Sequence, residues 1–132
     1  MKQVWVEFSA EEEKPLVFAA WVAKTPEQRG RGFQGVCPGL VTERSLLFVF
    51  PAPVKANFHM SGVALPLDIV FIDVFRQVIN IQRMALQESD RSTTYYRSDT
   101  VFQFALETAA ERLDQLRRNP RLWRMRVSNR NQ

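Results

Sequence analysis

The first residues of the chain alternate between apolar and polar positions. Val4, Val6 and Phe8 share one side of an extended backbone, which is the period of a half-buried β-strand. A continuous apolar stretch follows at 16–23; it is bounded by turn residues and is short for a buried helix. The pattern predicts a β-hairpin at the start of the chain.

A short helix is predicted to begin next to Thr25. Its hydroxyl can accept a hydrogen bond from the amide of Gln28, whose side chain can reach back, and Pro26 stands where no amide donor is needed. Three glycines between 30 and 35 disfavour a long helix, since each costs about 1 kcal/mol relative to alanine in a helix interior. We expect Pro38-Gly39 to end this helical region.

Two later stretches, 45–50 and 67–73, are apolar at nearly every position. Such runs are typical of strands that are covered on both faces, so these two are predicted to form the centre of the core. The segment between them, 51–66, contains Pro53 and Gly62 and is expected to be an irregular crossing segment.

The rest of the pattern continues the β character. It predicts a strand at 77–86, a polar loop at 87–100, a strand at 102–107, a helix at 109–118 and a final strand at 122–127. No internal repeat or domain boundary interrupts it, so residues 1–132 are predicted to form one mostly β domain.

Composition agrees with this prediction and excludes several classes of protein. Of the 132 residues, 45% are hydrophobic and 24% are charged, as in ordinary globular domains. No apolar run approaches the ~20 residues of a membrane span, and the first residues do not resemble a secretory signal, so a cytoplasmic location is expected. Cys37 is the only cysteine, which excludes an intrachain disulfide and a thiolate zinc cluster. We expect no cofactor and no metal.

Four blocks of the sequence resemble the signature blocks of a known family, domain of unknown function 192. They are the glycine-rich stretch 23–35, the apolar stretch 46–51, Phe58-His59-Met60 and the stretch 66–73. Their order and spacing agree over residues ~20–107, the family-like core. The resemblance implies a compact, antiparallel, barrel-like sheet with two short helices, and it implies no established activity.

The sequence also departs from this family. His59 stands where relatives usually carry tryptophan, and residues 108–132 form a divergent helix followed by a basic C-terminal segment. These departures imply that an ancestral surface site is either remodelled or lost.

Arginines are concentrated at the end of the chain. The net charge is +4, but the chain without the six arginines that follow Asp114 would carry −2. A basic tail of this kind contacts phosphate, an acidic protein surface or the body of its own domain, or is simply solvated. The six are Arg117, Arg118, Arg121, Arg124, Arg126 and Arg130.

His59, the only histidine, is the first candidate for chemistry. As a general base it would need Asp68 or Asp73 to orient it. As a metal ligand it has no partners nearby in sequence. The favoured interpretation is that its ring packs where the family's tryptophan usually stands. Asp68 and Asp73 lie five apart on one strand and point to opposite faces, which excludes a glycosidase-type pair. Asp68 is interpreted as a structural acceptor that fixes the crossing segment.

Aromatic and basic residues occur together in the polar loop and near the end of the chain, as they do in single-strand nucleic-acid surfaces and in protein interfaces. The favoured hypothesis is a non-enzymatic binding or assembly module that presents these regions to a protein partner, such as an accessory subunit of a viral or envelope assembly. The alternatives are nucleic-acid binding through the C-terminal arginines, and a small-ligand or hydrolytic pocket around His59 and Asp68. The candidate binding residues are Phe58, His59, Met60, Asp68, Tyr95, Tyr96, Arg97, Trp123, Arg124 and Arg126.

Overall fold

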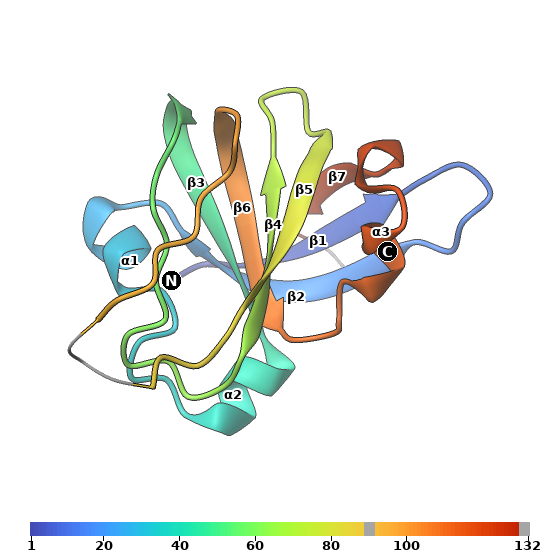
Figure 1. Ribbon diagram of the computed structural model, residues 1–132. Coiled ribbons are helices and arrows are strands. Elements are labelled where there is room, and N and C mark those ends of the chain that lie inside the picture. Colours follow the sequence, from blue (N-terminus) through green and yellow to red (C-terminus); the bar gives the residue numbers. More distant parts are fainter. Residues whose placement is uncertain (89–91, 130–132) are drawn as a thin grey trace.

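The computed structural model describes residues 1–88 and 92–129. Within them the fold is mostly β, as predicted: seven strands form one sheet in the order β5-β4-β6-β3-β2-β1-β7 (Figure 1). The elements are β1 (Gln3–Ser9), β2 (Leu16–Ala23), α1 (Pro26–Arg31), α2 (Pro38–Glu43), β3 (Ser45–Val54), β4 (Leu67–Ile72), β5 (Val78–Met84), β6 (Phe102–Ala109), α3 (Asp114–Arg117), the 3-10 helix η1 (Pro120–Leu122) and β7 (Arg124–Ser128).

The sheet is curled and almost closes into a barrel. All neighbouring strands are antiparallel except β2 and β3, which run parallel. At the two ends of the strand order, the amide of Val78 donates to the carbonyl of Trp123 at 3.0 Å, and the amide of Met125 donates to the carbonyl of Arg76 at 2.8 Å. These bonds join the β5 edge to the β7 edge, so the predicted barrel-like sheet is confirmed.

Both faces of the sheet carry a hydrophobic core. One core lies inside the curl and includes Trp123 and the two leucines of the α3 region, Leu113 and Leu116. The other lies outside, where residues 24–44 and the crossing segment cover the sheet with side chains such as Phe33. The crossing segment begins at residue 55 and not at 51 as expected, because β3 continues to Val54. Every residue of β4 is buried, which confirms that this strand is covered on both sides.

The helix predicted at Thr25 is present with its capping box. The Thr25 hydroxyl accepts from the Gln28 amide at 3.2 Å, and the Gln28 side chain accepts from the Thr25 amide at 3.2 Å. The expectation for Pro38-Gly39 was wrong: Pro38 opens α2 instead of ending a helical region, because proline fits the first turn of a helix, where no amide donor is needed.

The C-terminal segment is part of the sheet. The last predicted strand is present as β7, which pairs along β1, while the helix before it is only four residues long. No helix among the described residues has the length and apolar character required to cross a membrane.

Candidate functional site

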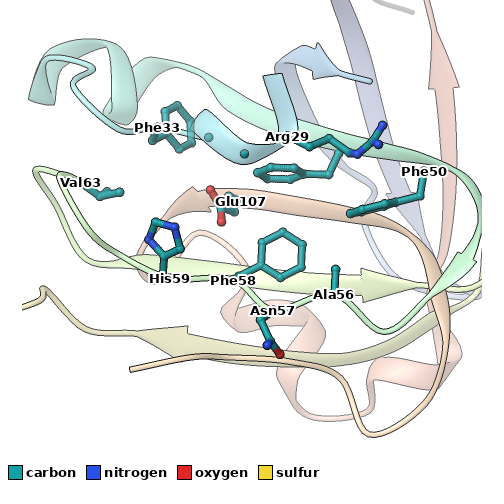
Figure 2. Close-up of a pocket in the computed structure, with 12 residues that line it drawn as sticks. Arg29, Phe33, Phe50, Ala56, Asn57, Phe58, His59, Val63 and Glu107 are labelled. Atoms are coloured by element: carbon teal, nitrogen blue, oxygen red, sulfur yellow. The ribbon is translucent and has the colours of Figure 1, made fainter. Parts of the chain in front are cut away.

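A pocket of about 230 Å³ lies on the outer face of the sheet, under the end of α1 and the crossing segment (Figure 2). Its floor comes from β6 and β3, and its walls come from the glycine-rich turn after α1 and from residues 56–63. We call it the Glu107 pocket; its lining includes Arg29, Gly32, Phe33, Phe48, Phe50, Phe58, His59 and Glu107.

Glu107 is the central polar group of this pocket. It lies on β6 between β3 and β4, opposite Leu46 and Ile69, and it is 4% exposed. Figure 2 shows its carboxyl pointing from the strand into the space between Phe33, Phe58 and His59. Among the described residues its side chain has no hydrogen-bond donor and no ion-pair partner, and burial raises its pKa to about 8. Glu107 is therefore mostly a neutral acid at pH 7.

The turn after α1 brings backbone close to this carboxyl. Gly32 has a φ of +53°, and a Cβ placed on it would lie 3.8 Å from Oε1 of Glu107 and 3.6 Å from Cζ of Phe48. Residues other than glycine rarely adopt this backbone conformation. The glycine-rich block therefore approaches the sheet closely at Gly32, whereas a Cβ at Gly30 or Gly35 would meet nothing within 4 Å.

Phenylalanine rings form much of the pocket wall and hold one another in place. The ring centroids of Phe48 and Phe58 lie 5.1 Å apart in an edge-to-face arrangement. Phe50 packs in the same manner on Phe102 at 5.5 Å. Because these rings are buried and interlocked, the aromatic part of the pocket is preformed.

Arg29 lies at one end of the pocket with its guanidinium already engaged. It donates to the backbone carbonyls of Lys24 and Val49, and it lies over the ring of Phe50 at 4.8 Å. In Figure 2 the guanidinium points toward Phe50 and away from Glu107. Its charge is therefore directed away from the buried carboxyl.

His59 lines the other end of the pocket. Its Nδ1 accepts a hydrogen bond from the amide of Ser61 at 3.2 Å, so this nitrogen carries no proton in that arrangement. Its ring packs edge to face with that of Tyr95, with centroids 6.4 Å apart. The structure brings together His59 and Tyr95, two of the predicted site residues.

Asp68, the predicted partner of His59, lies elsewhere. It is fully buried on the inner face of the sheet and accepts from Arg83, from Nη2 of Arg117 at 2.8 Å and from the amide of Glu111 at 2.8 Å. The bond to Asp68 raises the pKa of the Arg83 guanidinium. Asp68 thus fixes the turn before α3 instead of the crossing segment, and the pocket predicted around His59 and Asp68 has Glu107 in place of the aspartate.

Several other predicted binding residues are buried packing groups. Phe58, Met60 and Trp123 are 7%, 2% and 2% exposed. Tyr96 forms a two-bond antiparallel bridge with Phe58, with both N–O distances 2.8 Å. Of these four, Phe58 lines the Glu107 pocket, and it does so as a wall.

Three of the tail arginines bind the body of the domain. Arg117 pairs with Asp68, Arg124 donates to the carbonyl of Phe75 at 2.7 Å, and Arg126 lies 3.4 Å from Glu7. Arg97 is exposed, and its backbone carbonyl accepts from Gln82. Arg91 of the polar loop and Arg130, one of the six C-terminal arginines, lie outside the described residues.

A second pocket, of about 360 Å³, opens at the rim of the curled sheet. Its apolar wall includes Phe104, and its charged groups, Lys2, Lys24 and Arg76, are all exposed. The described lining therefore holds no buried ionisable group, in contrast to Glu107. Nor do the described residues contain a cluster of three histidine, cysteine or acidic side chains that could hold a metal ion.

The sequence interpretation missed Glu107 and Arg29. Glu107 alternates with the apolar residues of its strand, which predicts a solvated side chain. Its burial follows from its place on β6 between β3 and β4 and from the cover that residues 24–44 and the crossing segment give this face of the sheet. Neither the strand order nor this cover was part of the sequence pattern.

Comparisons with known proteins agree with this fold. A sequence model of the family described as Uncharacterized ACR, domain of unknown function 192, matches residues 7–120. The match confirms the resemblance and extends it into β1 and through α3. No curated protein sequence matches the chain significantly.

Two crystal structures of bacterial proteins share the architecture. One, from Sinorhizobium meliloti 1021, is provisionally described as a transcription regulator; it has a TM-score of 0.81 at 20% identity, covering 96% of this chain and 94% of that chain. The other, a protein of unknown function from Novosphingobium aromaticivorans DSM 12444, has a TM-score of 0.79 at 22% identity, covering 94% and 84%. At these identities the similarity shows the fold alone.

Proposed function

Because the chain belongs to the Uncharacterized ACR family, domain of unknown function 192, whose fold assigns no activity, we propose from the geometry of the Glu107 pocket that the protein is a small-ligand-binding module. The observation that carries this proposal is the buried Glu107 carboxyl, which lines a preformed cavity and has no partner among the described residues. A buried polar group without a partner costs about 1–3 kcal/mol. A ligand that hydrogen-bonds to it recovers that cost.

The composition of the pocket favours binding over covalent catalysis. Its described lining contains one carboxyl, one imidazole, one guanidinium and one carboxamide, and no serine, threonine, cysteine, tyrosine or lysine. The one carboxyl is mostly protonated at pH 7, which makes it a poor nucleophile. At about 230 Å³ it is smaller than the roughly 300–1,000 Å³ of pockets for drug-sized molecules. The expected ligand is therefore a compact molecule with one group that reaches Glu107.

The contacts of the basic tail give less support to the hypothesis that its arginines bind a protein or nucleic-acid partner. Arg117, Arg124 and Arg126 satisfy carboxylates or carbonyls of the same chain, which is one of the roles considered for this segment. The ligand-pocket proposal is supported by a buried carboxyl without a partner, and the described part of the tail contains no such group.

A screen of small polar compounds by two-dimensional amide NMR tests the proposal. Binding compounds should shift the amides of Gly32, His59 and Glu107 in the wild-type protein. Ala56→Leu, which adds an isopropyl group to a side chain that lines the pocket, should abolish those shifts, whereas Ala64→Leu, at an exposed position outside the pocket, should keep them. Compounds that bind both variants equally, or the absence of any compound that shifts these amides, would refute the proposal.

A further inference from the structure

The same pocket limits the chemistry of the group that can satisfy Glu107. The candidates are a neutral donor or acceptor, which would bind the protonated acid, and a cation, which would bind the carboxylate. The aromatic walls favour the cation over the neutral group, because the face of an aromatic ring attracts a cation within about 6 Å of its centroid. Quaternary ammonium ligands are recognised in this way.

We infer that the Glu107 pocket binds a small organic cation, whose ammonium group lies against the Glu107 carboxylate and the surrounding phenylalanine rings. This inference rests on the proposed function and names the ligand class of that site. Phe33, Phe48, Phe50 and Phe58 all line the cavity. One negative charge and several rings form a suitable environment for one compact positive charge.

One side-chain cation of the protein already packs against an aromatic ring of the pocket wall. Arg29 lies over Phe50 at 4.8 Å and binds two backbone carbonyls. Its guanidinium points away from Glu107 (Figure 2), and it makes no ion pair with that carboxylate among the described contacts. The carboxyl is thus left for a cation that enters from outside.

Binding of a cation is coupled to release of one proton. The carboxyl of Glu107 loses its proton to solvent, and the carboxylate pairs with the incoming ammonium. The charged or titratable groups that line the pocket around it are Arg29 from α1 and His59 from the crossing segment, while its neighbours on β3 and β4 are the apolar residues Leu46 and Ile69. With a pKa of about 8, about nine-tenths of the sites release a proton on binding at pH 7 and about one-tenth at pH 9.

Two probes of equal shape test the inference: choline, and its neutral carbon analogue 3,3-dimethyl-1-butanol. Calorimetry on the full chain should show choline binding at least about tenfold more tightly than the alcohol at pH 9. The affinity for choline should fall about tenfold from pH 9 to pH 7 and by about tenfold again to pH 6, and titrations at pH 7 in buffers of different ionisation enthalpy should show the released proton. The affinity for the alcohol should not show this fall.

The matched variants are Glu107→Gln, which keeps the shape and removes the charge, and Glu43→Gln at an exposed position. Choline binding should be lost in the first and kept in the second. If Glu107→Gln does not fold, the comparison of the two probes and the pH profile of the wild-type protein decide the question.

The possible results separate this inference from the proposed function. If the alcohol binds as tightly as choline and both are lost in Ala56→Leu, the cation class is wrong and the ligand site stands. If neither probe binds and the NMR screen finds only uncharged or anionic compounds in the pocket, the cation class is likewise wrong and the ligand site stands. If neither probe binds and the screen finds nothing, both proposals fail.

Discussion

Replacing Glu107 with glutamine should stabilise the protein, and the gain should depend on pH in a defined direction. The carboxyl has an ordinary pKa of 4.5 and a pKa of about 8 in the folded protein, where burial disfavours its charged form. Between these two values the unfolded chain releases the proton while the folded protein keeps it, so stability is lost as pH rises. At about 1.4 kcal/mol per pH unit, the loss reaches about 3 kcal/mol at pH 7 and levels off at about 5 kcal/mol above pH 8.

Urea denaturation followed by tryptophan fluorescence measures this effect at pH 4.5, 7 and 8.5. The free energy of unfolding of Glu107→Gln should match that of the wild type within about 1 kcal/mol at pH 4.5 and exceed it by about 3 kcal/mol at pH 7. Subtracting the wild type at each pH removes the titration of other groups, and Glu43→Gln, an exposed substitution, should show no such trend. A difference that is constant with pH, or a destabilised Glu107→Gln at pH 7, would refute the assignment of Glu107 as a buried, unpaired acid.

Three further predictions concern the contacts that hold the fold. Asp68→Asn removes the buried carboxylate that Arg83 and Arg117 share and leaves them only the exposed Asp114, so it should lower the free energy of unfolding by about 3 kcal/mol in urea titrations. Exposed Asp99→Asn is the control, and an equal effect of both would contradict the ion cluster. Thr25→Ala removes the capping box of α1 and should cost about 1 kcal/mol in the same measurement, so an unchanged value would show that the cap contributes nothing. Deleting residues 124–132 removes β7 and its pairing with β1, so thermal unfolding followed by circular dichroism should lose its cooperative transition; a melting curve like that of the full chain would mean that β7 is dispensable.

Local patterns in the sequence predicted the elements whose causes are local. The alternation of Val4, Val6 and Phe8 placed β1 correctly, because a half-buried strand has a period of two. The capping box at Thr25 placed the start of α1, because its hydrogen bonds join residues three apart. Proline was ambiguous at Pro38, where the same residue can end one helix or begin the next.

The candidate site depended on contacts that local patterns do not contain. The sequence pattern places Glu107 at a position of β6 that is expected to be solvated. In the structure it is buried, because residues 24–44 and the crossing segment cover that face of β6. Asp68 and His59 are close in sequence, yet the sheet separates them, because Asp68 lies on the inner face beside Arg117. Closeness in sequence therefore suggested an Asp68–His59 pair that the fold does not make, and the carboxyl that shares the pocket lining with His59 is that of Glu107.

The arginine-rich tail illustrates the limit of charge counting. Six arginines after Asp114 predicted a charged segment with several possible partners. Arg117 and Arg126 instead pair with Asp68 and Glu7 of the same domain. Net charge gives the sign of a segment, whereas the partner of each arginine depends on the tertiary fold.

The most direct test of the account is a pH titration of the Glu107 side-chain carboxyl by carbon-13 NMR, with choline absent and present. We predict a midpoint near pH 8 in the free protein, as burial of the unpaired acid requires, and a shift of that midpoint to lower pH when choline fills the pocket. A midpoint near the ordinary value of 4.5 in the free protein would contradict the claim that the pocket holds a buried neutral acid.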